Sequence, residues 1–263
     1  MGDIMSKLDR VGETILNTFG STMVIVEYRN CMDIDVYFPK YDYIAEGVQY
    51  SNFKNGNVKC PYEPKVYNHG YIGEGKYKAK ENGKGTKCYK AWHNMLERCY
   101  NPKYHEKNST YKTCIISKEW LNFQNFGDWF DDNYYEIEGQ RMDLDKDVLV
   151  KGNKIYSSDN CVFVPHNINT LFIKCDKRRG ELPIGVCYDK RAKKFITRCN
   201  VYDYKTNKNK TKYLGYYDTS QQAFEVYKQF KEDYIKEVAD YYKDKIPKKL
   251  YDAMYKYEVD IDD

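Results

Sequence analysis

The sequence predicts an α+β protein built from more than one domain. Two stretches near its beginning and three near its end are strand-like, and one of the early ones, Asp33–Phe38, alternates apolar with polar residues as a half-buried strand does. Other segments carry apolar residues at every third or fourth position, which is typical of amphipathic helices. A chain of 263 residues is long enough for two or three small cores. We expect a small β module over 1–66, a central ββα domain with packed helices over 67–176, a three-stranded sheet with one helix over 177–245, and a charged tail over 246–263.

Strand-like residues dominate the first module. Met23–Tyr28 and Asp33–Phe38 favour strands, and two shorter strand-like segments follow over 43–53 and 58–62. The residues between these two segments, Lys54-Asn55-Gly56-Asn57, are typical of a hairpin turn. A structural or protein-contact module fits this pattern, and so does a minor nucleic-acid contact.

Two helices are expected in the central region. Residues 86–100 carry apolar side chains at helical spacing, namely Trp92, Met95, Leu96 and Cys99. Asn101-Pro102 ends this helix, because the residue before a proline disfavours the helical conformation. The second helix begins near Ser117, a suitable N-cap, and extends to Phe130, with Gly127 bending or dividing it.

A strand, a turn, a second strand and the start of a helix are predicted over 143–172. The apolar run Val148-Leu149-Val150 leads into Lys151-Gly152-Asn153-Lys154, which can form a tight turn. Cys161–Val164 returns as the second strand, and Pro165 opens the helix. A unit of this kind places polar side chains around a small cleft, where a metal or a phosphate can bind.

This unit resembles the ββα-metal core of HNH nucleases, especially the variants in phage-encoded homing-endonuclease-like proteins. The family pattern has an Asp-His pair at the end of the first strand, an Asn near the second strand, and a His or Asn about nine residues later. Asp145-Lys146, Asn160 and Asn169 fall on these positions, and His166 lies one turn before Asn169. The resemblance implies a Mg2+ ion held near Asp145 and Asn169, which would polarise the phosphate.

The resemblance also implies catalytic roles. Lys146 stands where the family has the His that activates the attacking water, and a lysine near its usual pKa of ~10.4 is protonated at neutral pH and cannot act as a base. His166 is then the nearby candidate base, Asn160 occupies the middle position, and Lys146 and Arg98 would supply electrostatic stabilisation. Arg98 can equally pair with a carboxylate on a neighbouring element.

Three carboxylates at period-two spacing precede the predicted turn. If Asp143, Asp145 and Asp147 belong to one strand, they lie on the same face of it. Such a face can bind Mg2+ through oxygen ligands, or it can be a solvated face whose charge neighbouring lysines balance.

The last 80 residues favour three short strands followed by a long helix. The strands are expected over 184–188, 194–201 and 212–217, with a polar loop over 203–210, and Thr219 or Ser220 can cap a helix over 221–242. Because side chains alternate along a strand, one set of the middle strand packs on the helix and the other points away. The first set is Phe195, Thr197 and Cys199, and the second is Lys194, Ile196, Arg198 and Asn200.

This segment resembles an AP2-type DNA-binding domain over about 60 residues. The matching positions are Gly185-Val186, Phe195-x-Thr197-x-Cys199, Leu214-Gly215-Tyr216-Tyr217 followed by Thr219, and Ala223 with Tyr227. The family's sheet enters the major groove of DNA while its helix supports the sheet from behind. Arg198 is then the candidate for a base-edge contact, and the other candidate DNA-binding residues are Lys190, Arg191, Lys194, Asn200 and Tyr213. A merely solvated sheet face is the alternative.

Charge and cysteine content limit the function classes. Residues 174–212 contain 13 Lys and Arg against 4 Asp and Glu, a net charge of +9, whereas the whole chain carries only +4. This segment is therefore the candidate for binding a polyanion. Nine scattered cysteines without a Cys-x-x-Cys pair favour reduced thiols, and no apolar run reaches the ~18 residues of a membrane span. We expect no membrane association and a location in the cytoplasm of the host cell.

Together these patterns predict a DNA-binding protein of the homing-endonuclease type, as found in phages and mobile elements. Its expected partner is double-stranded DNA, and its expected cofactor, if it cleaves, is Mg2+. The alternative is a catalytically inactive, nuclease-derived binding protein that regulates a gene or inhibits a host defence enzyme, which the replacement of the family's His by Lys146 favours. Binding to structured RNA is a third possibility.

Overall fold

The computed structural model describes residues 10–173, 180–203, 208–261 and 263. These residues form a mixed α+β fold with several small sheets, so the predicted fold class is confirmed at that level. The chain divides into two compact units, Met1–Lys103 with Lys118–Asp128, and Tyr104–Ser117 with Trp129–Asp263. The expected boundary after residue 66 falls inside the first unit, and those after 176 and 245 fall inside the second.

A four-stranded antiparallel sheet opens the first unit. Its strands lie in the order β1 (Thr14–Leu16), β2 (Thr22–Asn30), β3 (Asp33–Phe38) and β4 (Tyr43–Val48), with the 3-10 turn η1 (Pro39–Tyr41) between the last two. Helix α1 (Tyr50–Lys54) follows and contributes Phe53 to the sheet's buried cluster. The prediction of a strand over 58–62 is wrong, the one over 43–53 ends at Val48, and β1 was not predicted.

The remainder of the first unit is mainly helical. The hairpin β5 (Lys80–Glu81) and β6 (Lys84–Gly85) precedes α2 (Lys87–Tyr100), and Thr86 caps α2 by accepting a hydrogen bond from the Tyr89 backbone N–H. The 3-10 turn η3 (Glu119–Leu121) and the first part of α4 (Phe123–Asn133) complete it. Contrary to expectation, α4 runs unbroken through Gly127. A Cβ atom at that position would lie 2.3 Å from the Tyr77 ring, so the glycine makes room for this ring.

The second unit contains the predicted ββα segment, with a different first strand. Strand β8 (Met142–Asp145) pairs antiparallel with β10 (Val162–Pro165), and helix α5 (His166–Asn169) and the turn η4 (Thr170–Phe172) follow. Residues 148–150, predicted as a strand, form a bend whose Val148 is buried. The polar turn is present, since Gly152 has a φ of +79°. Helix α3 (Pro102–Lys107) and the turn η2 (Ser109–Tyr111) lead to β7 (Ile115–Ile116), which pairs in parallel with β9 (Ile155–Tyr156).

The two faces of the β8–β10 pair have different neighbours. Phe163, which lies opposite Leu144, packs against the rings of Trp129, Phe130 and Tyr134. Val162 and Val164 belong to a buried cluster that includes residues of the long helix α7 (Ser220–Tyr242). Directly opposite residues of an antiparallel pair share a face, so Asp143, opposite Val164, lies on the side of α5 and α7.

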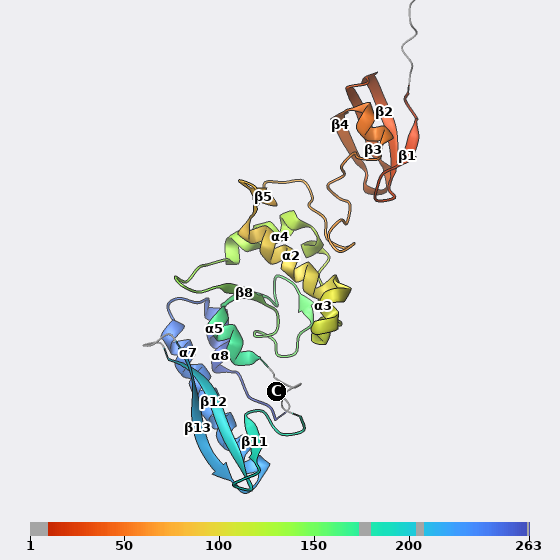
Figure 1. Ribbon diagram of the computed structural model, residues 1–263. Coiled ribbons are helices and arrows are strands. Elements are labelled where there is room, and N and C mark those ends of the chain that lie inside the picture. The colour runs from red at the N-terminus through yellow and green to blue at the C-terminus, as the bar shows by residue number, and fades with distance from the viewer. Residues whose placement is uncertain (1–9, 174–179, 204–207, 262) are drawn as a thin grey trace, which may run out of the picture. The chain divides into compact units, whose positions relative to one another are not determined.

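The predicted three strands and helix are all present in the C-terminal part. Strands β11 (Val186–Asp189), β12 (Lys194–Asp203) and β13 (Lys208–Tyr217) form an antiparallel sheet in this order, with α7 packed along it (Figure 1). Thr219 caps α7, because its hydroxyl accepts a hydrogen bond from the Gln222 backbone N–H. Of the predicted polar loop over 203–210, residues 204–207 lie outside the described residues, and β13 begins within it, at Lys208.

Helix α7 belongs to two buried clusters. Its first half packs on the sheet through Ala223, Phe224 and Tyr227. Its second half packs on the ββα segment, together with α8 (Lys248–Tyr255). One helix therefore joins two segments that we had expected to be separate domains.

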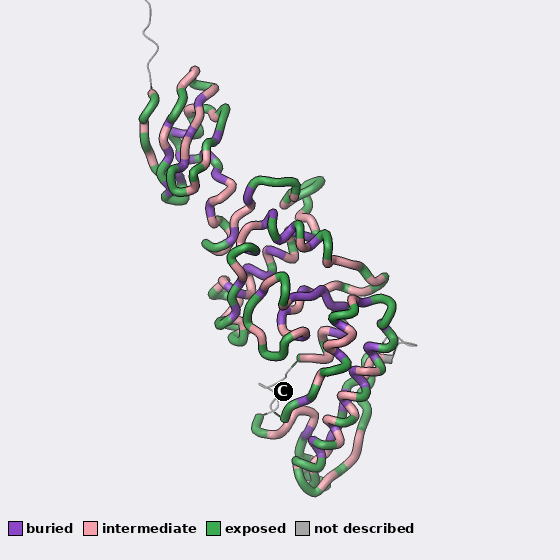
Figure 2. Tube along the Cα trace, turned by 180° about the vertical axis from the view of Figure 1, so that it is seen from behind, coloured by how far each residue is buried: buried purple, intermediate pink, exposed green. Residues whose placement is uncertain are grey.

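The expected charged tail over 246–263 is part of the second unit and packs within it. Val259 is buried among the residues of α7 and the sheet. The Lys151 Nζ atom lies 2.6 Å from the Asp260 carboxylate, so the polar turn holds this segment. Figure 2 shows how buried and exposed stretches alternate along the chain. None of the described helices combines the length and the apolar character that a membrane crossing requires.

Candidate nucleic-acid interface

Four polar side chains meet where β10 passes into α5. The Asp143 Oδ2 atom lies 2.6 Å from His166 Nδ1 and accepts a hydrogen bond of 3.2 Å from the Asn169 amide. The Arg141 Nε atom donates to Asp143 Oδ1 over 2.9 Å, and Arg141 Nη2 lies 2.6 Å from His166 Nδ1. We call Arg141, Asp143, His166 and Asn169 the polar cluster.

Strand pairing assembles the polar cluster. Asp143 lies opposite Val164, two residues before His166, and the His166 backbone N–H donates to the Arg141 carbonyl over 2.8 Å. His166 and Asn169 are three positions apart on α5, so both side chains project from one face of this helix. The register therefore brings Asp143 to both of them.

The charge of Asp143 orients the imidazole. Burial would raise the pKa of Asp143, but the hydrogen bonds from His166, Arg141 and Asn169 outweigh burial and hold that pKa below its usual range. His166 Nδ1 can donate to the ionised Asp143 in one neutral tautomer and can accept from Arg141 Nη2 in the other. In the tautomer that donates to Asp143, Nε2 carries the lone pair that a general base requires.

The β8–β10 pair separates the predicted catalytic residues into two groups. Lys146 follows the end of β8 and Asn160 precedes the start of β10, so both lie at the end of the pair where Asp145 meets Val162. His166 follows β10 at its other end, and four strand residues span roughly 14 Å. The structure therefore does not bring Lys146 and Asn160 to His166.

Lys146 is buried beside a carboxylate and two aromatic rings that do not belong to the polar cluster. Its Nζ atom lies 3.0 Å from Asp147 Oδ2 and 5.9 Å from the centres of the Tyr111 and Tyr156 rings. Burial would lower the pKa of Lys146, but the charge of Asp147 outweighs burial and raises it. Lys146 is therefore a protonated partner of Asp147. A protonated lysine has no free lone pair, so it cannot act as a base.

The predicted metal ligands Asp145 and Asn169 belong to different hydrogen-bonded sets. Asn169 donates to Asp143, whereas Asp145 Oδ1 accepts the backbone N–H groups of Asp147 and Val148, each over 2.8 Å. Strand β8 ends at Asp145, so Asp147 does not continue a strand face of three carboxylates. Within the described residues, no group of three or more His, Cys, Asp and Glu side chains could hold a metal ion. The described hydrogen bonds therefore do not join Asp145 to Asn169, and the expected Mg2+ ion stays a prediction.

The setting of Asp145 predicts a pH-dependent stability. Burial, with the nearby charge of Asp147, raises the pKa of Asp145 to about 6. The unfolded carboxyl group releases its proton near ~3.9, so between these values the folded chain binds more protons. The free energy of unfolding should therefore fall as the pH rises from about 4 to 6, by on the order of 2 kcal/mol, with the loss complete above pH 6.

Asp145→Asn tests this expectation. The amide oxygen can still accept the two backbone N–H groups, but the side chain no longer titrates. We expect urea unfolding at pH 4 to 7 to show a flatter pH dependence and a higher stability at pH 7 than the natural sequence. Glu225→Gln, at an exposed carboxylate of α7, should leave the slope unchanged. Equal slopes for Asp145→Asn and the natural sequence would contradict the expectation.

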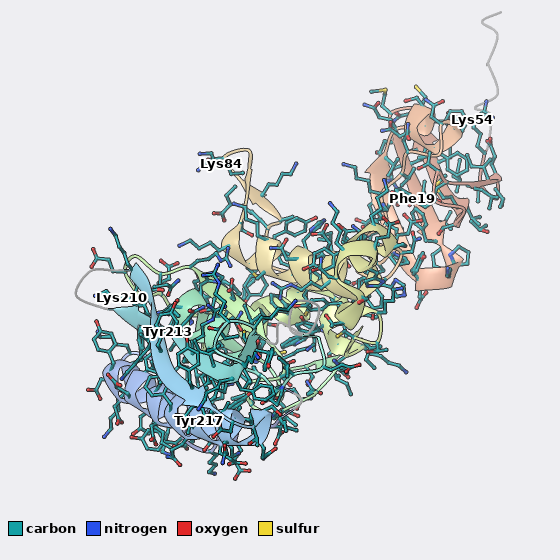
Figure 3. All side chains as sticks on the ribbon, turned by 60° about the horizontal axis from the view of Figure 1, so that its bottom comes forward. Phe19, Lys54, Lys84, Lys210, Tyr213 and Tyr217 are labelled. Atoms are coloured by element: carbon teal, nitrogen blue, oxygen red, sulfur yellow. The ribbon has the colours of Figure 1, made fainter. Side chains whose placement is uncertain are left out.

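The outward face of the C-terminal sheet carries the predicted DNA-binding residues as alternation requires. Thr197 and Cys199 are buried, whereas Lys194, Arg198 and Asn200 are exposed. Tyr213 lies directly opposite Arg198 and is 66% exposed. Figure 3 shows Lys210, Tyr213 and Tyr217 spaced along β13. Lys190 and Arg191 are exposed in the turn between β11 and β12.

The polar partners of these side chains differ. Lys194 pairs with Asp218 over 3.1 Å, and Asn200 accepts a hydrogen bond from the Thr211 hydroxyl. The Arg198 guanidinium has no hydrogen bond or ion pair to any described residue. Its five N–H donors are therefore available to a ligand.

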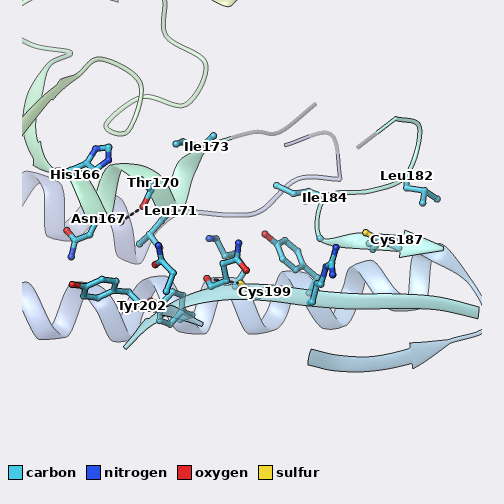
Figure 4. Close-up of a pocket in the computed structure, with 18 of the residues that line it drawn as sticks. His166, Asn167, Thr170, Leu171, Ile173, Leu182, Ile184, Cys187, Cys199 and Tyr202 are labelled. Atoms are coloured by element: carbon cyan, nitrogen blue, oxygen red, sulfur yellow. Dashed lines mark hydrogen bonds between the residues drawn. The ribbon is translucent and has the colours of Figure 1, made fainter. Parts of the chain in front are cut away.

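A groove of about 1000 Å³ connects the polar cluster with this sheet. His166 and Asn167 lie on one side of the groove, and Cys199 and Tyr202 on the other (Figure 4). Arg141, Arg198 and Asn200 also line it. Strand β11 pairs with Lys194–Thr197 of β12, and farther along this strand the Tyr202 backbone N–H donates to the Tyr234 hydroxyl. The described residues that line the groove include Arg141, His166, Arg198 and Lys231 and no carboxylate. The groove is therefore suited to an anionic ligand.

Arg141 was not expected at the site, and Arg98 belongs to the other unit. Asp143 was expected only as one of three carboxylates that could bind Mg2+, and its pairing with His166 was not predicted, because the apolar run 148–150 was taken as a strand. With the strand at Met142–Asp145, period-two alternation would have paired Asp143 with the helix that carries His166. Arg98, the predicted phosphate contact, is a half-buried residue of α2 in the first unit, whereas the polar cluster belongs to the second.

Comparison of the chain with protein-family models, with curated proteins and with solved structures found no match.

Proposed function

We propose that this protein binds double-stranded DNA and is of the homing-endonuclease type found in phages and mobile elements. The observation that carries the proposal is the basic groove, which is lined by Arg198, without a partner among the described residues, and by His166, which pairs with Asp143. Phosphate contacts would hold the duplex on the sheet, and Arg198 would read a base edge. The exposed Lys190, Arg191 and Lys194 would neutralise phosphates.

The polar cluster supports phosphodiester cleavage as the activity to test. His166, oriented by Asp143, can accept a proton from the attacking water, and the Arg141 guanidinium can stabilise the charge that develops on the phosphate. A resemblance to HNH nucleases would add a Mg2+ ion that polarises the phosphate, and this remains a prediction. Asn160 and Lys146 have no part in this assignment, because they lie at the other end of the strand pair.

A nicking assay on supercoiled DNA, with Mg2+ or Mn2+, tests the assignment. Replacing His166 by alanine should lower the cleavage rate about 10²- to 10⁴-fold, the usual contribution of a general base. Binding of the same DNA in EDTA should change little, because His166 is one of several groups along the groove. Lys146→Met serves as the control for cleavage, provided that circular dichroism shows a folded protein.

Survival of cleavage after replacement of both His166 and Asn169 would overturn the catalytic assignment. Binding in EDTA without cleavage by the natural sequence would favour the second candidate function, a nuclease-derived binding protein that acts as a regulator or as an inhibitor of a host defence enzyme. The buried Lys146–Asp147 pair, at the position where the family has its His, is the observation in favour of this second function.

A further inference from the structure

A lysine occupies a core position of α7 beside the groove. Tyr227, Lys231, Tyr234 and Val238 follow one another at spacings of four, three and four residues, so they share one stripe of the helix. The other three are buried, and Lys231 is only 9% exposed. A lysine is rarely so deeply buried unless its charge is paired.

The described residues provide no such pair. Lys231 makes no hydrogen bond or ion pair with any of them. Burial lowers the pKa of Lys231, and the nearby Cys199 thiol offsets this only in part. An uncompensated ammonium group in this position lowers the stability of the folded protein. A bound anion would restore that stability by pairing with the charge.

Two cavities adjoin Lys231, and each suggests a source of negative charge that could compensate its ammonium group. One is a small cavity of about 10 Å³ that Lys231 shares with Tyr257 and Asp263. This volume suits about one water molecule, which could bridge to the Asp263 carboxylate. The other is the basic groove, whose described lining residues include Arg141 and Arg198 and no carboxylate. Among the described residues on the groove side none can supply the anion, so a ligand can.

We propose that Lys231, with Arg141 as a further cationic group of the groove, forms a binding site for a backbone phosphate of a nucleic-acid strand. The inference rests on the proposed function and extends it, because it places one strand inside the groove beside His166 as well as on the sheet. A free phosphate or a nucleotide has the same chemistry, so the test separates these sources from the polymer.

Lys231→Met and Lys236→Met form a matched pair of variants. Both remove one positive charge from α7, but Lys236 does not line the groove. Lys231→Met should have an unchanged or higher melting temperature, because it replaces a buried unpaired charge by an apolar chain of similar length. A loss of binding would then not reflect unfolding.

Affinity is measured by fluorescence anisotropy for a duplex of 20 base pairs at several salt concentrations, and by calorimetry for a 5′-phosphorylated thymidine dinucleotide and for inorganic phosphate. We expect Lys231→Met to weaken duplex binding about tenfold and to lower the salt slope by about one. Lys236→Met should change the affinity less than threefold. The dinucleotide should bind more tightly than inorganic phosphate, and Lys231→Met should abolish its binding.

Different results would overturn the phosphate site at Lys231 and the proposed DNA-binding function. Duplex affinity and salt slope that are the same in Lys231→Met and the natural sequence would overturn the phosphate site while leaving DNA binding intact. Asp263 also pairs with Lys151 over 2.7 Å, so its link to Lys231 is measured with both single variants and the double variant. Beside such a result, non-additive effects of Lys231→Met and Asp263→Asn on stability would assign the compensation to the small cavity. Binding of the dinucleotide in a Lys231-dependent manner, without any duplex binding, would support the phosphate site and overturn the proposed function. Equal affinity for inorganic phosphate and the dinucleotide would overturn the assignment to a nucleic-acid strand.

Discussion

Replacing Arg198 by alanine should lower the affinity for the preferred duplex about 10- to 100-fold, because a bidentate contact of arginine with guanine contributes roughly 1–3 kcal/mol. The side chain is exposed on the outward face of β12 and has no partner among the described residues, so no internal ion pair is lost. The preference for the correct base at one position should relax as well. Competition between a selected site and its single-base variants measures both effects.

Arg191→Ala is the matched control, because it removes the same side chain from the exposed turn between β11 and β12. It should weaken binding to all sequences alike and lower the salt slope by about one, as expected for a phosphate contact. Equal behaviour of the two variants, with no change in sequence preference, would show that Arg198 reads no base. No change in either variant would place the DNA on another surface.

Phe163→Ala should lower the free energy of unfolding of the second unit by about 3–5 kcal/mol, the usual effect of removing a buried phenyl ring. Phe163 is 1% exposed, and its ring centre lies 5.0 to 5.5 Å from those of Trp129, Phe130 and Tyr134. Strand β10 carries Phe163 on one face and leads into His166, so the polar cluster should lose its geometry as well. Urea unfolding followed by near-ultraviolet circular dichroism measures the change.

Tyr213→Ala removes an aromatic ring of similar size that is 66% exposed in the same unit. Its effect on stability should stay within about 0.5 kcal/mol. A comparable loss in both variants would mean that the rings around Phe163 do not form a cooperative core. Binding of DNA, by contrast, should respond to Tyr213→Ala, because this ring lies opposite Arg198 on the outward face.

The sequence predicts secondary structure and burial best where one segment contains both the periodic pattern and the residues that it packs against. The strands and helix after residue 184 are all found, and the alternation of Thr197 and Cys199 with Arg198 and Asn200 correctly separates buried from exposed positions. Helix α2 is also found as predicted, although Thr86 is its N-cap and not its first residue. In these segments local spacing decides which side of an element is apolar, and the apolar side must be buried.

The same reasoning placed the central strand wrongly. Val148-Leu149-Val150 is as apolar as a strand, but it forms a bend, and Val148 is buried through tertiary packing alone. The strand that pairs with β10 is Met142–Asp145, whose carboxylates made it look like a surface segment. Apolar content indicates burial, whereas the choice of pairing partner depends on contacts that are distant in the sequence.

The composition and periodicity of this chain therefore determine its α+β class, the basic outward face of its last sheet and the cap of its long helix. Tertiary structure decided that α7 joins two expected domains and that Asp143 rather than Asp145 meets His166. It also decided that Lys231 faces a groove whose described lining residues include no carboxylate. The physical reason is that backbone periodicity sets the direction of each side chain, whereas a site requires side chains from several elements. Only the strand register and the packing of the helices bring them together.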